Sequence, residues 1–496
     1  MVKDRQKVKI DRLNIRKMIA IAGIGILVLS LIPMLWVSIY NHPTGDDIFY
    51  GLEAHQTWEK TGSVLSTIAT AIQGVGSDYY RWQGTFVALF FMRLQPTVFG
   101  ESLYCLTPFL VIGLLVGGLF YAVKISAKYI LPMDKWDILS VWAISSFVML
   151  QWVQVVGDAF YWFNGALYYG GFFGLMLFGV GAAIEYYFAG KKRHLVMLLI
   201  LSIMIGGGNY ISLLVSLIVL TLTCGYLLWK KSDRRLGFVA AEVLLVGCFI
   251  ISAMAPGNAI RQGTRAPMQP LEAIWNSLLQ GFAYIETWGT GWWMLGIFAL
   301  LPTMVTIIKK SGCKFRLPGL VLVFLYGLFC AMQCPTMYAE GTTGPGRVVN
   351  VIWYGFILLS YVAVFYLLGW ICNTAKEIWL IDRRRLYLVW ISACAVLLVV
   401  QVGVGWKNGS IKNMTTLKAV SDITSGRAKA YDSEYEQRIT ILRDTSIEEV
   451  VFEEYRNKPK TVYVGDYSSD TSVGANIHLA KWYGKQSVRV NYATTE

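Results

Sequence analysis

Long apolar runs separated by polar loops dominate the chain up to about residue 404. Most of them hold about 17 to 23 residues, the length that an α-helix needs to cross a lipid bilayer. Because backbone amides in lipid must pair within their own segment or within a closed barrel, runs of this length predict helices. We predict about eleven spans, at residues 18–40, 104–123, 138–156, 170–188, 195–209, 211–229, 238–254, 293–308, 317–333, 351–369 and 387–404.

Some segments depart from a simple series of spans. Residues 195–209 form a short predicted span that ends in three glycines and Asn209, a pattern typical of a tilted or broken helix. Apolar residues also recur at helical spacing in the ranges 62–76 and 270–289. These two stretches predict helices that lie along the outer membrane interface, unless they only fill long loops. The apolar run at 86–94 is too brief to cross.

The pattern changes near Trp406, beyond which the composition is that of a soluble domain. We predict helices near 415–443 and 477–483, and strands near 449–455, 461–465 and 487–492. A small α/β domain therefore follows the last span.

Lys and Arg gather in alternate loops, and this asymmetry predicts the orientation of the chain. The N-terminus and every second loop carry 25 of them, whereas the opposite loops hold Lys60, Arg81, Arg93, Arg261, Arg265 and Arg347. Because basic loops stay in the cytoplasm, the N-terminus is predicted to be cytoplasmic and the tail extracytoplasmic. The predicted parts are a basic N-terminus at 1–17, a transmembrane domain at 18–404 with a long first outer loop at 41–103, and an outer α/β tail at 405–496.

Composition supports an α-helical polytopic membrane protein. The chain of 496 residues is 55% hydrophobic and 15% charged, which is too apolar for one soluble core. The basic loops account for most of the net charge of +13, and their expected partners are membrane lipids, so no nucleic-acid partner is predicted. The first apolar run has no small-residue cleavage site after it, which predicts a retained anchor.

An acidic pair follows directly after the first span. Asp46 and Asp47 stand in the segment HPTGDDIFYG, where Pro43 and Gly45 break the helix. One interpretation is a catalytic base, because a carboxylate at the membrane surface could accept the proton of a sugar hydroxyl that attacks an activated anomeric carbon. The other is helix capping, in which Thr44 or Asp46 caps the next helix and its dipole favours both carboxylates. The sequence leaves both open.

Aromatic, amide and acidic residues cluster in two outer segments. The candidate acceptor or sugar contacts are Asp78 and Trp82 in DYYRWQG, and Asp158, Tyr161, Trp162 and Asn164 in GDAFYWFNG. Aromatic rings beside amides and carboxylates are typical of sugar-binding sites. Trp and Tyr also gather at headgroup depth in membrane proteins, which is the alternative for the aromatic residues.

Four outer arginines are candidate ligands of a donor phosphate: Arg347, Arg81, Arg261 and Arg265. In the segment EGTTGPGRVVN, Gly344 and Gly346 would let backbone N–H groups and the Arg347 guanidinium face one anion together. The alternative for all four is contact with lipid headgroups.

Several features together resemble the GT-C superfamily of polyprenyl-phosphate-sugar glycosyltransferases. They are the basic N-terminus, the acidic pair after the first span, the amphipathic outer helices, the roughly eleven spans and the polar outer tail. The segments GDDIFYG, RWQG, GDAFYWFNG, PGRVVN and VGDYSSD…ANIHLAKWYGKQSVRV are similar to those of a bacterial family of multi-pass envelope proteins.

The resemblance implies an inverting glycosyltransferase of the bacterial cytoplasmic membrane. Its donor would be an undecaprenyl-phosphate-sugar and its acceptor an envelope glycopolymer, either a cell-wall polysaccharide or a teichoic acid. Asp46 or Asp47 would be the base, and Arg347 would loosely match a contact to the donor phosphate. No metal or other cofactor is predicted, because arginine alone can stabilise a lipid-phosphate leaving group. The outer carboxylates open to a metal would be Asp46, Asp47, Asp78 and Asp158.

Two alternatives remain. A lipid-linked substrate transporter or flippase would place ionisable residues or broken helices near the membrane midplane. The glycines at 206–208 fit that expectation, whereas Glu185 and Glu242 lie toward the cytoplasmic ends of their spans. An envelope-glycan polymerase or ligase would use the same kind of site with a whole lipid-linked chain as donor.

Overall fold

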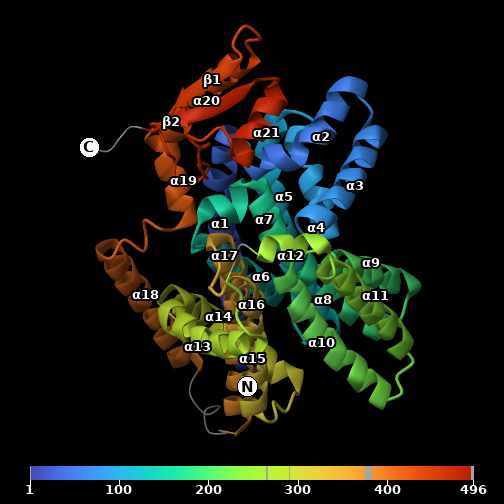
Figure 1. Cartoon of the computed structure of the whole chain (residues 1–496). Coiled ribbons are helices and arrows are strands. Elements are labelled where there is room, and N and C mark those ends of the chain that lie inside the picture. Colours follow the sequence, from blue (N-terminus) through green and yellow to red (C-terminus); the bar gives the residue numbers. More distant parts are fainter. Residues whose placement is uncertain (1, 264–265, 290, 375–382, 493–496) are drawn as a thin grey trace.

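The computed structural model describes residues 2–263, 266–289, 291–374 and 383–492, and almost all of its regular structure is helical (Figure 1). The membrane domain and its outer helices are α1 (Val2–Trp36), α2 (Asp46–Thr61), α3 (Val64–Arg81), α4 (Phe86–Arg93), α5 (Thr107–Tyr129), α6 (Lys135–Gln151), α7 (Phe163–Ala166), α8 (Phe172–Ala189), α9 (Lys192–Gly206), α10 (Tyr210–Trp229), α11 (Arg235–Ala253), α12 (Pro256–Gln262), α13 (Pro270–Trp288), α14 (Gly291–Ser311), α15 (Pro318–Ala331), α16 (Cys334–Glu340), α17 (Gly346–Thr374) and α18 (Arg383–Lys407). The tail adds α19 (Thr415–Thr424), α20 (Arg427–Arg443), β1 (Glu449–Glu453), α21 (Gly474–Tyr483) and β2 (Ser487–Asn491).

Within the described residues, nine helices are long and apolar enough to cross a membrane. They are Ile15–Tyr40, Glu101–Tyr129, Phe163–Ala189, Tyr210–Trp229, Arg235–Ala253, Gly291–Ser311, Pro318–Glu340, Gly346–Thr374 and Val389–Lys407, and each overlaps a predicted span. The predicted spans at 138–156 and 195–209 form α6 and α9, which have 17 and 15 residues. A crossing needs roughly 17 to 25 residues, so α6 is at the lower limit and α9 is below it. The chain is a polytopic α-helical protein, and the count of eleven spans stays a prediction.

The predicted break after residue 205 is the end of α9. Gly207 follows the helix, and its carbonyl accepts a hydrogen bond of 2.9 Å from the backbone N–H of Val87 in α4. Asn209 then caps α10, because its side-chain oxygen accepts from the N–H groups of Ile211 and Ser212. The short apolar helix α4 therefore closes the end of α9.

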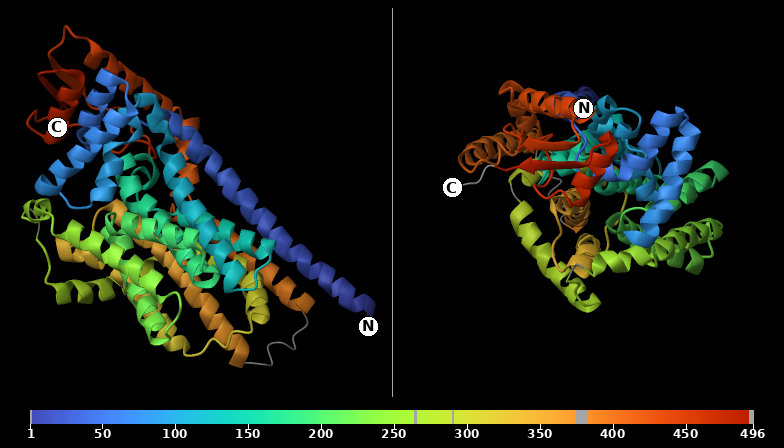
Figure 2. Two further views of the ribbon diagram at one scale, coloured as in Figure 1. Left: turned by 90° about the vertical axis from the view of Figure 1, so that its right-hand side faces the viewer. Right: turned by 45° about the horizontal axis from the view of Figure 1, so that its top comes forward.

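The chain begins and ends at opposite ends of the molecule (Figure 2). Loops rich in Lys and Arg join the spans at the end where α1 begins, which we call the basic end. The helices α2 and α3 and the tail lie at the other end, which we call the cap end (Figure 1). The positions of the charged loops thus agree with the alternation read from the sequence.

The tail differs from its prediction in two places. The helix predicted over 415–443 is divided into α19 and α20 at Gly426, where φ is 73° and favours glycine. Residues 461–465 form no strand, because the backbone N–H and hydroxyl of Thr461 both donate to the Asp422 carboxylate instead. The strands β1 and β2 pair in parallel, from Glu449 with Ser487 to Glu453 with Asn491.

Both segments predicted to lie along the interface are helical, α3 and α13, but they are placed differently from each other. The helices α2 and α3 pack as an antiparallel hairpin around Gly62, which projects from the cap end beside the tail (Figure 1). α3 therefore does not lie across the bundle. The helix α13 exposes apolar side chains, among them Leu271, Trp275 and Phe282, and it packs against α15.

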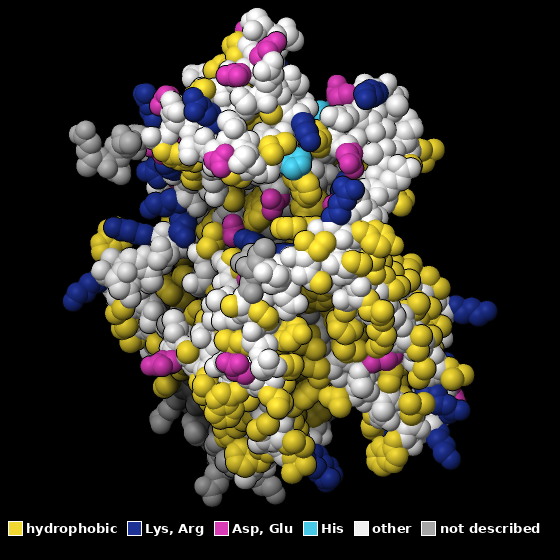
Figure 3. All heavy atoms as spheres, viewed as in Figure 1, with side chains coloured by type: hydrophobic (Ala, Val, Ile, Leu, Met, Phe, Trp, Pro, Cys, Tyr) yellow, Lys and Arg dark blue, Asp and Glu magenta, His cyan; other side chains and the backbone are white. Residues whose placement is uncertain are grey.

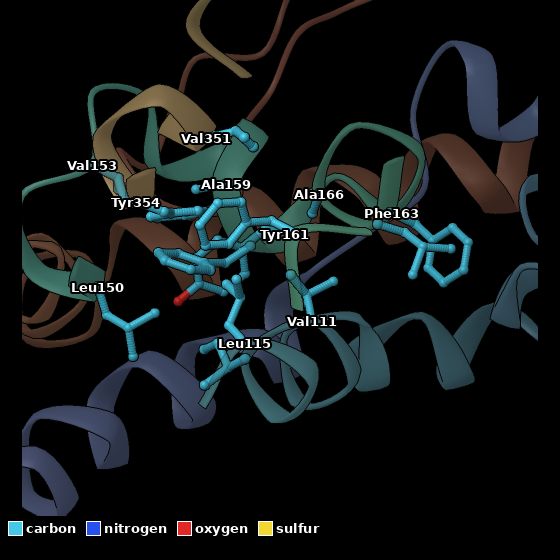
Figure 4. Close-up of a cluster of buried hydrophobic side chains, with 14 of the residues drawn as sticks. Val111, Leu115, Leu150, Val153, Ala159, Tyr161, Phe163, Ala166, Val351 and Tyr354 are labelled. Carbon is cyan, nitrogen blue, oxygen red and sulfur yellow. The ribbon is translucent and has the colours of Figure 1, made fainter. Parts of the chain in front are cut away.

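A buried apolar cluster supports the chain segment that follows α6. Tyr161, Phe163 and Ala166 pack with Val111 and Leu115 of α5, and with Leu150, Val153, Ala159, Val351 and Tyr354 (Figure 4). This segment contains two π-helical turns, Gly157–Tyr161 and Leu167–Gly171, on either side of α7. Such turns are frequent at functional sites. The cluster positions Trp162 and Asn164, which alternate with its buried residues.

Candidate functional site

Asp47 is a completely buried carboxylate in the first turn of α2. Its Oδ2 accepts hydrogen bonds from the backbone N–H of Thr44, at 3.2 Å, and from the hydroxyl of Tyr104. Its Oδ1 accepts from the backbone N–H of Asn164, at 3.3 Å. Asp47 therefore ties the start of α2 to the start of the second span and to α7. The predicted capping by Thr44 or Asp46 is not found, because Gly45 is the N-cap of α2 and no side chain caps it.

The pKa of Asp47 is raised to about 7. Burial raises it most because the charged form is removed from water. The donors from Tyr104, Thr44 and Asn164 lower it by stabilising the carboxylate, and neighbouring Asp46 raises it further. No acceptor hydroxyl could reach a carboxylate that is fully covered and accepts three hydrogen bonds.

Asp46 points the other way. Gly45, with a φ of 51°, precedes the helix and turns the chain so that the Asp46 side chain is exposed. The surrounding protein still removes enough water to raise the pKa of this carboxyl group, while Arg347, Arg261 and His478 oppose that shift through their positive charge. A carboxylate with a raised pKa that solvent can reach has the properties of a general base.

Arg347 stands at the start of α17 and joins two parts of the site. Its guanidinium lies 5.3 Å from the centre of the Trp162 ring, and its Nη1 lies 4.0 Å from Oδ2 of Asp158. That distance is too long for a hydrogen bond, so the pair is a loose one. Burial raises the pKa of Asp158, and Arg347 opposes the shift through its charge and its backbone N–H.

Arg261 is placed at the end of α12 by the RWQG segment. Its Nη1 donates to Oε1 of Gln83 at 2.5 Å, and its guanidinium lies 5.3 Å from the centre of the Trp82 ring. Arg81, in the same segment, is exposed and makes no hydrogen bond or ion pair among the described residues. Arg265 lies outside the described residues. Of the four predicted phosphate ligands, Arg347 and Arg261 lie near enough for their charges to act on Asp46.

A buried amide and a buried ring nitrogen beside these groups lack partners within the described part of the chain. Asn164 is only 3% exposed, yet neither its amide oxygen nor its amide nitrogen makes a hydrogen bond. The ring N–H of Trp162 is unpaired as well. Buried polar groups in proteins are nearly always hydrogen-bonded, so an unpaired amide next to Asp47 indicates a place for a ligand or water.

Two predicted contacts have structural roles instead. Both carboxylate oxygens of Asp78 accept from Arg93, at 2.8 and 2.9 Å, and Arg93 also donates to Glu53 at 2.8 Å. The hydroxyl of Tyr161 donates to the carbonyl oxygen of Met34 at 2.7 Å. These bonds hold α3 to α4 and α1 to the segment after α6, and neither side chain is free to bind a sugar.

His478 is a member of the site that the sequence interpretation did not single out. It lies on α21 of the tail, where its ring contacts that of Phe49 at 4.6 Å between centroids, and its charge acts on Asp46. The segment ANIHLAKWYG carried part of the family resemblance but contained no signal that it folds back onto α2. Acidic and basic side chains gather in a recess between the tail and the membrane helices (Figure 3).

No three His, Cys, Asp or Glu side chains among the described residues converge closely enough to hold a metal ion.

Searches against profiles of known protein families and against curated proteins found no match. The resemblance to the GT-C superfamily therefore stays a prediction from the residues.

Proposed function

We propose that the chain is a membrane glycosyltransferase that moves a sugar from an undecaprenyl-phosphate-linked donor to an envelope glycopolymer. The observation that carries this proposal is the exposed Asp46 carboxylate in the field of Arg347 and Arg261. A base for a hydroxyl group and cations for a phosphate are the two requirements of such a transfer.

The proposed step is a single displacement. The acceptor hydroxyl gives its proton to Asp46 while its oxygen forms a bond to the anomeric carbon of the donor. The bond between that carbon and the phosphate oxygen breaks, and the lipid phosphate leaves with the electron pair. Attack opposite the leaving group inverts the configuration at the anomeric carbon.

The arginines would hold the departing phosphate. Arg347 makes only a loose pair with Asp158, so its guanidinium can bind a phosphate without first breaking a short ion pair. Trp162 supports the guanidinium from one side, and the unpaired amide of Asn164 supplies a donor and an acceptor for sugar hydroxyls. Asp47 would position α2 and would not touch the substrate.

The proposed setting is the bacterial cytoplasmic membrane with the basic end in the cytoplasm. Basic loops favour the inner side of the membrane, which places Asp46 and the tail outside. A recess at the outer ends of the spans would let a prenyl chain stay in lipid while its phosphate reaches the arginines.

A transporter is supported less well. The in-span carboxylates Glu185 and Glu242 accept from the hydroxyls of Tyr121 and Thr221, and only Oε2 of Glu242 has no partner among the described residues. Glu185 is also paired with Lys128 toward the basic end. An envelope-glycan polymerase or ligase fits the site equally, and donors with one sugar or with an oligosaccharide would separate the two activities.

The deciding experiment is the substitution Asp46→Asn in protein purified into nanodiscs. Transfer from a panel of radiolabelled undecaprenyl-phosphate hexoses to extracted wall glycopolymer should fall by about 10² to 10⁴-fold, the usual contribution of a general base. Asp233→Asn, which changes an exposed aspartate between α10 and α11, is the matched control and should keep full activity. Full transfer by the Asp46→Asn protein would rule out the proposed mechanism.

A further inference from the structure

A polar groove lies between the two helices of the α2–α3 hairpin. Its volume is about 370 Å³, which is within the range of small-ligand sites, about 300 to 1,000 Å³. The walls include Glu53, Gln56 and Lys60 of α2 and Thr70, Gln73 and Ser77 of α3. All of these side chains are polar, so the groove does not suit an apolar chain.

Glu53, the one acidic residue in the groove wall, has its charge neutralised by Arg93. Arg93 donates to the Glu53 carboxylate at 2.8 Å and also binds both oxygens of Asp78. Gly74 permits this arrangement, because a side chain at that position would collide with the Arg93 guanidinium. The remaining wall offers the hydroxyl of Ser77, two amides and the ammonium of Lys60, whereas the hydroxyls of Thr57 and Thr70 already pair with each other at 3.0 Å. Such a surface suits a hydroxyl-rich ligand, either neutral or with an anionic group near Lys60.

The groove continues the line of Asp46 along α2. Asp46, Glu53 and Lys60 are seven residues apart, so they share nearly one face of the helix. At 1.5 Å per residue, Glu53 and Lys60 lie roughly 10 and 21 Å from Asp46 along the axis. The hairpin projects beyond the bundle at the cap end (Figure 1), so the groove leads from water toward the carboxylate. Arg347 and Arg261 come from helices on the membrane side of that carboxylate.

We infer that this groove binds the acceptor glycan as it leads one hydroxyl to Asp46. The inference rests on the proposed function, since it assigns the acceptor to a site of its own. The donor and the acceptor would then approach the base from opposite directions. Gln56 and Gln73 would bind the glycan by hydrogen bonds from the two walls.

Binding in a protein that cannot turn over tests this site directly. The Asp46→Asn protein in nanodiscs would be titrated with two wall fractions from the source strain lacking this protein, its neutral polysaccharide and its teichoic acid. Adding Gln56→Ala and Gln73→Ala should weaken the binding of at least one fraction by about tenfold, the loss of one or two hydrogen bonds. Adding Gln437→Ala instead, at an exposed glutamine of α20, should leave binding unchanged.

Equal binding with and without the groove substitutions, or no binding of either fraction, would overturn the inference. A second variant, Ser77→Trp, fills the groove and should raise the KM for the polymer in protein that retains Asp46. These outcomes are independent of the proposed mechanism. If the groove substitutions weaken binding while Asp46→Asn alone retains full transfer, the groove stands and the role of Asp46 fails.

Discussion

The two ends of the helical bundle carry charged clusters that are built differently. At the basic end, Nη1 of Arg16 lies 2.6 Å from Asp134 and 2.8 Å from Asp137, and both carboxylates also cap α6. At the cap end, Arg347 approaches Asp158 only to 4.0 Å. The unpaired amide of Asn164 lies in the same region.

This difference separates a cluster that stabilises the fold from one that is arranged to bind. Short bonds among Arg16, Asp134 and Asp137 satisfy each group within the chain, so nothing remains for a ligand. At the cap end, an unsatisfied buried polar group costs about 1 to 3 kcal/mol, and a ligand could recover that energy. Substitutions at the two ends should therefore act on different properties.

The largest expected effect is on folding at the basic end. Arg16→Ala removes the cation that hydrogen-bonds the buried Asp137 carboxylate and leaves only the half-exposed Lys310 at 3.7 Å, so it should lower the free energy of unfolding by about 3 to 5 kcal/mol. Thermal unfolding in detergent measures the change. Lys310→Ala is the control, because Lys310 is half exposed and lies 3.6 Å from Asp134, where a pair contributes about 1 kcal/mol or less. If properly folded Arg16→Ala protein lost sugar-transfer activity, the cluster at the basic end would not be purely structural, and the contrast between the two ends would fail.

The next effect is on transfer at the cap end. Arg347→Ala removes a proposed phosphate ligand and should lower kcat/KM by about 10² to 10³-fold, the usual cost of losing one preorganised charge-stabilising group. The unfolding midpoint should not change, since the pair with Asp158 is long. Arg347→Lys should recover only part of the rate, because an ammonium does not bind phosphate in the bidentate way of a guanidinium. An unfolding midpoint lowered as much as in Arg16→Ala would remove the distinction between the two ends.

Hydropathy predicted most of the membrane domain, because a span is a local property of composition. All nine candidate membrane helices of the described residues overlap predicted spans. The segments predicted at 138–156 and 195–209 form α6 and α9, which begin and end a few residues earlier than predicted. In the second case a contact decides the end, since α4 binds the carbonyl of Gly207. Hydropathy does not report contacts between separate segments.

The residues around Asp46 show the same limit at the site. Their segments could be chosen from the sequence by charge and aromatic content, and Arg347, Asp158 and Trp162 do lie together. Which carboxylate of the pair faces inward could not be chosen, because it depends on Tyr104, far along the chain. The approach of His478 depends on how the whole tail packs against α2.

The adjacent carboxylates allow a smaller and sharper test. Asp47→Asn replaces one acceptor oxygen by an amide nitrogen, which cannot accept from Tyr104 and Thr44. We expect a loss of about 1 to 3 kcal/mol in the free energy of unfolding. Asp46→Asn should lose activity with no loss of stability. Thermal unfolding of both variants side by side measures this, and equal stability losses would mean that Asp46 is also a structural cap.

The smallest effect expected is a shift in pH dependence. A base must be deprotonated, so transfer should fall as the pH falls through the raised pKa of Asp46. Arg347, Arg261 and His478 each favour the ionised form of Asp46 through positive charge.

Removing one cation therefore raises the pKa of Asp46 further. For His478→Gln, the acidic limb of the kcat/KM profile should move to higher pH by a few tenths of a unit, about 0.5 kcal/mol. Lys481→Gln, an exposed cation on the same helix, is the control and should leave the limb in place. A limb that moves to lower pH would contradict this prediction. It would mean that the carboxylate limiting transfer is not Asp46.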